Sequence, residues 1–102
     1  MALKVNGKTY DFRYTSRSID VIEAATDKPI MANLVQNRMM VKMADLKIMF
    51  TQGLRDESGT IVPQDIADKI FESVLHERGY FVVAGMITEA LERDCGFFFL
   101  EG

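Results

Sequence analysis

Two side chains of this 102-residue chain belong to types that often carry chemistry: His76, its only histidine, and Cys95, its only cysteine. A catalytic histidine needs a nucleophile or an acid beside it, and a metal-binding histidine needs further ligands at a set spacing. The sequence around His76 offers neither, so we expect it at a helix surface. Cys95 follows Asp94 and lacks the electropositive neighbours that activate a thiol, so we expect it to be packed.

An acidic pair and two glycines also fail to form a site. Asp56 and Glu57 lie in the segment RDESGT, which is typical of a polar turn, and no EF-hand spacing surrounds them. Gly53 and Gly59 do not form a phosphate-binding loop, because no Lys-Ser or Lys-Thr follows. The sequence therefore predicts a protein that is not an enzyme and holds no metal or cofactor.

Methionine gives a clearer signal. Five methionines fall within nineteen residues: Met31, Met39, Met40, Met43 and Met49. Methionine is flexible and polarizable, and it recurs on surfaces that accept varied apolar partners. Two interpretations stay open: the cluster fills a small irregular core, or it lines a groove for a partner. Met39, Met40 and Val41 cannot all face one core on a single helix, so we expect at least one to be exposed or buried against another chain.

A second apolar cluster closes the sequence, in the segment CGFFFLEG. It consists of Phe97, Phe98, Phe99 and Leu100. Because an exposed run of this kind is an aggregation hazard, we expect it to fold back onto the final helix or onto a neighbouring subunit. These four residues and the five methionines are the candidates for a partner or oligomer interface.

Charge restricts the class of partner. Residues 1–43 carry a net charge of +3 and residues 44–102 a net charge of −6. The acidic second half argues against nucleic acid and against anionic membrane, because both require clustered Lys and Arg. No apolar run approaches the roughly 18 residues that span a bilayer, and no signal segment is visible. These observations predict a cytoplasmic protein.

The elements that position these residues begin with a β-hairpin. Asn6-Gly7 suits a type I′ turn, and the apolar residues on both sides of it alternate with a period of two. Because an isolated hairpin is only marginally stable, its aromatic face should pack onto helices. That face is formed by Tyr10, Phe12 and Tyr14.

Helical patterns follow. Thr15 or Ser16 caps a first helix, Pro29 opens a second, and Ala44 begins a third that ends near Gly53. Pro63 opens a fourth helix that Gly79 ends, and a last helix runs from Tyr80 to about Asp94. Its interior Gly85 indicates close helix packing. The residues expected inward are Ile19 and Ile22, with Val21 as a further candidate; Ile30, Leu34 and Val35; Leu46, Met49, Phe50 and Leu54; Ile66, Ile70, Phe71 and Val74; and Phe81, Ala84, Ile87 and Leu91.

The predicted fold is α+β and mainly α-helical, with four to five helices and an N-terminal β-hairpin. The chain is expected to be a single domain, 1–102, because no linker divides it. Its parts would be the hairpin (1–15), a helical body (16–95) and the apolar C-terminal tail (96–102).

This ordered layout resembles the tail assembly chaperones of long-tailed bacteriophages. The resemblance lies in the hairpin LKVNGKTYDFRYT, the helix SIDVIEAATDKPI, the Gly-Leu step of DLKIMFTQGLRDE, the helix VPQDIADKIFESVL and the apolar last helix. Two positions depart from the family pattern. Asp27 replaces the usual Gly-Lys turn, and Phe50 replaces a tryptophan or tyrosine.

The resemblance implies a chaperone that binds the tape-measure protein, an amphipathic helical partner, and keeps it soluble while the tail tube assembles. It names the tail tube protein as a further candidate partner and implies a homo-oligomer. Such a protein would act in the host bacterial cytoplasm and be absent from the finished virion. Family members are often made in two lengths by ribosomal frameshifting, and Phe98-Phe99-Leu100 can be encoded by a slippery uridine run.

Two other classes stay open. The chain could instead be a structural virion component, such as a tail completion or connector protein. It could also be a small regulatory DNA-binding helical protein, although the charge of −6 on residues 44–102 weighs against duplex binding.

Overall fold

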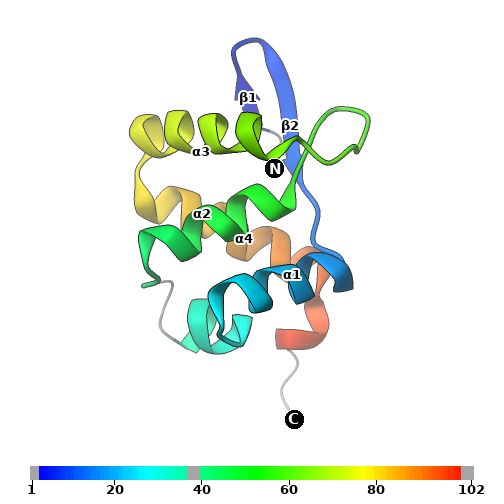
Figure 1. The fold of residues 1–102 in the computed structure, drawn as a ribbon, viewed down its shortest axis with the longest axis vertical. Helices are drawn as coiled ribbons and strands as arrows, with labels where there is room; N and C mark the ends of the chain where they lie inside the picture. The colour runs from blue at the N-terminus through cyan, green and yellow to red at the C-terminus, as the bar shows by residue number, and fades with distance from the viewer. Residues whose placement is uncertain (1–2, 37–39, 100–102) are drawn as a thin grey trace.

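A computed structural model describes residues 3–36 and 40–99 of the chain, and it has the predicted α+β, mainly helical architecture. The hairpin strands β1 (Leu3–Val5) and β2 (Lys8–Phe12) lie at one end of the long axis (Figure 1). Helix α2 (Met43–Gly53) lies between α1 (Ser16–Thr26) and α3 (Gln64–Arg78), and α4 (Tyr80–Asp94) packs behind α2. Two short helices complete the fold: a π-helix, η1 (Met31–Gln36), and a 3-10 helix, η2 (Gly96–Phe99).

The hairpin forms as its turn chemistry predicts. Asn6 has φ 52° and Gly7 has φ 78°, the left-handed conformations that a type I′ turn requires. The antiparallel register pairs Leu3 with Tyr10 and Val5 with Lys8. A third strand, β3 (Leu54–Arg55), pairs antiparallel with β2 through Leu54 and Phe12, giving the sheet order β1-β2-β3. The sequence did not predict β3, because two residues cannot show a period.

The aromatic face of the hairpin packs into the helical core, as expected. The ring of Phe12 meets that of Phe50 at 5.1 Å between centroids, and the Phe50 ring meets that of Phe71 at 5.3 Å, both edge to face. Phe50 and Phe71 are fully buried. This row joins β2, α2 and α3 into one core.

Helix α1 begins and ends at the residues that its sequence indicates. The Thr15 side chain accepts from Ser18 N at 3.1 Å, and Ser18 Oγ accepts from Thr15 N at 3.2 Å, which completes a capping box. Asp27 ends the helix in the left-handed conformation, with φ 58°. Ile19 and Ile22 are buried, whereas Val21 is exposed and the expectation that it points inward is wrong.

The segment after Pro29 is shorter than predicted. Ile30 and Leu34 are buried as expected, and the Val35 side chain lies outside the described residues. The described helical turn is Met31–Gln36, and residues 40–42 are not helical. The Asn33 side chain bonds Asp45 across the fold, an interaction that holds this turn to α2.

Two further expectations about the helices are wrong. Ile66 belongs to the predicted inward stripe but lies on the first turn of α3, where it is exposed. A Cβ added at Gly85 would meet nothing within 4 Å, so this glycine does not mark a close helix contact. Gly53 does mark a close contact of a helix, because a Cβ there would collide with the Tyr14 ring.

Candidate interaction surface

The predicted interface methionines lie in different environments in the structure. Met49 is fully buried in the core, so the expectation that it lies at an interface is wrong for the folded chain. Met31 is half-buried in η1. Met40 and Met43 are exposed by 64% and 48%, and Met39 lies outside the described residues. Met49 therefore fills the core, as one interpretation of the cluster predicts, and a partner groove at the exposed Met40 and Met43 stays a prediction.

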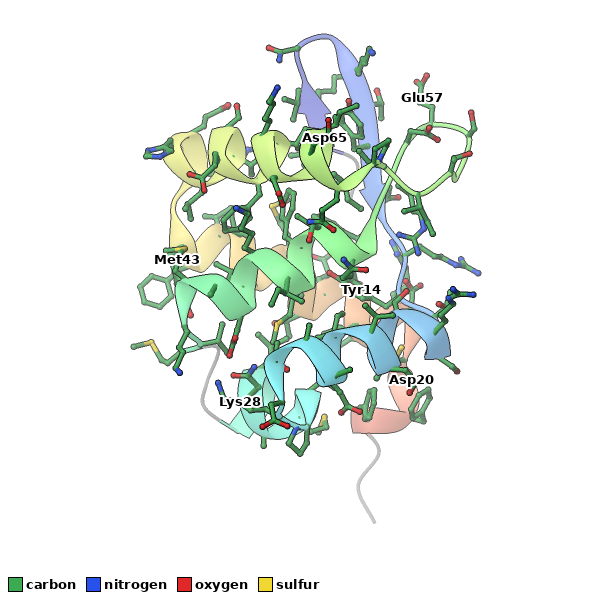
Figure 2. The ribbon with its side chains drawn as sticks, viewed as in Figure 1. Tyr14, Asp20, Lys28, Met43, Glu57 and Asp65 are labelled. Atoms are coloured by element: carbon green, nitrogen blue, oxygen red, sulfur yellow. The ribbon has the colours of Figure 1, made fainter. Side chains whose placement is uncertain are left out.

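Met40 lies in an apolar depression together with Val41, Tyr80 and Phe81; its volume is about 330 Å³. Met43 begins α2 on this side of the molecule, near the start of α4 (Figure 2). Phe81 is 66% exposed, which corrects the expectation that it begins the buried stripe of the last helix. We call Met40, Val41, Met43, Tyr80 and Phe81 the Met40–Phe81 surface.

The first turn of α4 explains why Phe81 is exposed. The helix begins directly after Gly79, and its buried residues start only at Val83 and Ala84. Tyr80 occupies the inward place instead, half-buried against the core. Because Phe81 is the next residue on the helix, it points away from that contact.

Hydrogen bonds fix the floor of the depression. The Tyr80 hydroxyl donates to Val41 O at 2.8 Å and accepts from Val41 N at 2.6 Å. Val41 itself is buried. This pair of bonds ties the segment before α2 to the first turn of α4. The Tyr80 and Phe81 rings also meet edge to face at 5.4 Å. The exposed side chains of the Met40–Phe81 surface are therefore apolar, and the Tyr80 hydroxyl is bonded to the backbone of Val41.

A buried acid holds the start of α2. Asp45 accepts from Lys28 Nζ at 2.7 Å and from Asn33 Nδ2 at 3.1 Å. Burial alone would raise the pKa of Asp45, but the hydrogen bonds from Lys28 and Asn33 outweigh it and hold the pKa below its usual range. Asp45 thus stays ionised at neutral pH and links η1, and the turn between α1 and η1, to α2.

The C-terminal candidates also divide. Phe98 is partly buried and packs against the core, as predicted for a tail that folds back, whereas Phe97 is 63% exposed. The Phe99 side chain and Leu100 lie outside the described residues. In the last helix, sequence reasoning wrongly assigned Phe81 to the core, and its neighbour Val82 is also exposed, by 48%. The sequence did contain a signal for exposed apolar residues here, because the segment YFVVAGM is too apolar for every residue to face inward.

The chemistry-bearing residues lie apart from this surface. His76 is exposed on α3, with Nε2 at 3.6 Å from Glu72 Oε2. Cys95 is buried, and burial raises the pKa of its thiol. Within residues 3–36 and 40–99, no group of three His, Cys, Asp or Glu side chains is arranged to hold a metal ion. None of the helices in this part of the chain is long and apolar enough to cross a membrane.

Comparison of the chain with protein-family models, with curated proteins and with solved structures gives no significant match.

Proposed function

We propose that this protein is a tail assembly chaperone of a long-tailed bacteriophage, which binds the tape-measure protein without catalysis and keeps it soluble. The resemblance of the ordered sequence layout supplies the family, and the Met40–Phe81 surface supplies the observation that carries the proposal. Met40 and Phe81 are large apolar side chains, each about two-thirds exposed, around one depression. Exposed apolar patches on small proteins commonly mark interaction sites.

The chemistry of this surface suits an amphipathic helix. Such a helix presents apolar side chains at intervals of three and four residues, and a groove that receives them must adapt to different shapes. Met40 and Met43 supply unbranched, flexible side chains, while Phe81 supplies a rigid ring. A tape-measure protein with repeated amphipathic segments would offer many such faces, and several chaperone copies would cover it.

The test is co-expression with the tape-measure protein that, on this proposal, a neighbouring gene encodes. The wild-type protein should raise the soluble fraction of the partner, and the double variant Met40→Ser/Phe81→Ser should not. Ile61→Ser is the matched control, because Ile61 is an equally exposed apolar residue, 64%, in the turn before α3. Unchanged melting of both variants would show that the fold is retained. Equal solubilisation by the wild type and both variants would reject the Met40–Phe81 surface as the binding site for the tape-measure protein.

Purified virions distinguish the proposal from a structural virion component. A chaperone is absent from finished tails, so mass spectrometry of purified particles should not detect the chain, and its stoichiometric presence would overturn the proposal.

The coding sequence tests the frameshift hypothesis. An uninterrupted uridine run over Phe98-Phe99-Leu100 is expected, and codons that break the run would dismiss it.

A further inference from the structure

A second pocket lies where β2, β3 and the end of α4 meet. Its volume is about 510 Å³, and three of its lining residues are arginines from three different segments: Arg13, Arg55 and Arg93. Glu57, which also lines it, lies on the opposite side of the molecule from Met43 in Figure 2. The pocket is therefore separate from the Met40–Phe81 surface.

Arg55 is the unusual member of this set, because it is only 8% exposed. Its Nη1 donates to Gln52 O at 3.0 Å and to Leu54 O at 3.1 Å, and its Nη2 lies at 3.5 Å from Ser18 Oγ. A guanidinium has five N–H donors. Nε donates to no described residue, and since no enclosed side-chain nitrogen in the described part of the chain lacks a partner, Nε is open to solvent.

The buried charge of Arg55 is not matched by an acid. Buried charges in proteins are normally paired, yet Arg55 forms no ion pair with a carboxylate of the described residues. Its charged neighbour is another cation. Burial lowers the pKa of Arg55; the nearby Tyr14 opposes this effect, and the positive charge of Arg13 adds to it.

Two of the three carboxylates that line the pocket, those of Asp11 and Asp56, already have partners. Asp11 Oδ1 accepts from Phe12 N at 2.7 Å and lies 3.7 Å from Arg93 Nη1. Asp56 Oδ1 accepts from Ser58 N at 2.9 Å and from Thr60 N at 3.0 Å within its own turn.

Arg93 is also occupied. Its Nε donates to Asp94 Oδ1 at 2.9 Å, and its Nη2 donates to Asp94 Oδ2 at 3.0 Å and to Phe12 O. Arg13 and Arg55 are thus the two pocket guanidinium groups that form no ion pair with a described carboxylate, although Arg13 lies near enough to Asp94 to lower the pKa of that carboxyl.

We propose that this pocket binds a carboxylate side chain of an acidic protein segment, held between Arg13 and Arg55. Guanidinium donors and a carboxylate form short, charge-assisted hydrogen bonds, and an anion between two like charges relieves their repulsion. A singly charged carboxylate suits the site better than phosphate, because Asp11, Asp56 and Glu57 also line the pocket and repel a larger negative charge. The inference does not depend on the proposed function, since it concerns a different surface.

The test is a titration of the full ¹⁵N-labelled chain at pH 7 and constant ionic strength. The probe is the blocked peptide acetyl-Ala-Glu-Ala-amide, and its uncharged match is acetyl-Ala-Gln-Ala-amide. The Glu peptide should give a saturable shift of the Arg55 Nε–H signal. The Gln peptide should bind at least about tenfold more weakly, because it loses a charge-assisted bond.

Arg13→Gln should weaken binding of the Glu peptide by about tenfold, because it removes one of the two guanidinium groups that would hold the carboxylate. The exposed side chain of Arg13 can be replaced without loss of the backbone hydrogen bond from Arg13 N to Gly53 O. Arg17→Gln, an exposed arginine of α1 outside the pocket, should leave binding unchanged. The proposal would be overturned by equal binding of the two peptides, by a shift that never saturates, or by an Arg13→Gln variant that binds the Glu peptide as tightly as the wild type does. Tighter binding of inorganic phosphate than of the Glu peptide would also overturn it, by showing a phosphate site.

Discussion

The ring of Tyr14 lies against the backbone of Gly53, so closely that a Cβ at position 53 would stand 2.4 Å from the ring Cζ. The Tyr14 hydroxyl donates to Met49 O at 2.8 Å, one turn earlier in the same helix. The next residue, Leu54, then leaves the helix and pairs with Phe12 in the sheet. At the Gly-Leu step, α2 therefore ends at Gly53, whose missing side chain accommodates the Tyr14 ring, and β3 begins at Leu54.

Substitution of Gly53 tests this contact. Gly53→Ala should destabilise the protein by about 2 kcal/mol or more, because the buried Tyr14 ring cannot move aside without losing its hydrogen bond. Gly85→Ala is the matched control. It should be neutral or stabilise by up to about 1 kcal/mol, because a Cβ there meets nothing within 4 Å and alanine is the better helix former. Urea denaturation measures both; equal effects would contradict the steric reading.

Acid stability should depend on Asp94. Its Oδ2 accepts from Tyr14 N at 2.8 Å, and it pairs with Arg93. Burial alone would raise the pKa of Asp94, but the bonds from Arg93 and from the Tyr14 backbone outweigh it and hold the pKa below its usual range. The unfolded chain therefore takes up this proton first as pH falls, so the stabilisation is complete above about pH 4 and disappears as pH drops through the native pKa.

Asp94→Asn should cost roughly 1–3 kcal/mol at pH 7 and flatten the dependence of unfolding free energy on pH below about 4. The amide can still accept from Tyr14 N, so the fold should persist. Asp20→Asn, at an exposed position of α1, should keep the wild-type profile. Urea unfolding at several acidic pH values compares the three; an Asp94→Asn profile as steep as the wild type would disprove this assignment.

The two described phenylalanine side chains of the tail should differ in their effect on stability. Phe98→Ala should lower it by about 1–2 kcal/mol, because Phe98 is partly buried against the core. Phe97→Ala should leave it within about 0.5 kcal/mol, since that ring is mostly exposed. Thermal unfolding followed by circular dichroism separates the pair. A larger loss at Phe97 would mean that the ring is buried in solution by another copy.

Tyr80 should control the shape of the Met40–Phe81 surface. Tyr80→Phe removes the hydroxyl that bonds both backbone groups of Val41, and a cost of about 1–2 kcal/mol is expected. Amide hydrogen exchange at Val41 should accelerate more than exchange in α3. Exchange that rises equally throughout the chain would show only global destabilisation.

Local sequence signals predicted the elements whose causes are local. Asn6-Gly7 specified the hairpin, Thr15 the start of α1 and Gly79 the end of α3. Strand β3 escaped prediction because its two residues become a strand only by pairing with β2. The π-helical turn likewise depends on a distant partner, the bond from Asn33 to Asp45.

The candidate surface was predicted in part for a related reason. Met40 and Met43 were identified by composition, which does not depend on orientation. Phe81 was assigned to the core but lies at the surface, because a helical stripe shows which residues share a face but not where the core ends along the helix. Met49 is buried, as its own helical stripe predicted, although composition had also made it an interface candidate. That Arg13 and Arg55 line the same pocket has no sequence signal, since 42 positions separate them.

The contacts between Tyr14 and the end of α4 also determine when the protein can fold. Tyr14 N bonds Asp94 across 80 positions, and Arg93 bonds Phe12 O across 81. Contacts so distant in sequence slow folding, because the intervening chain must close before they form. The hairpin and α1 therefore leave the ribosome before the residues that hold them, and the core closes only after almost the whole chain has been synthesised.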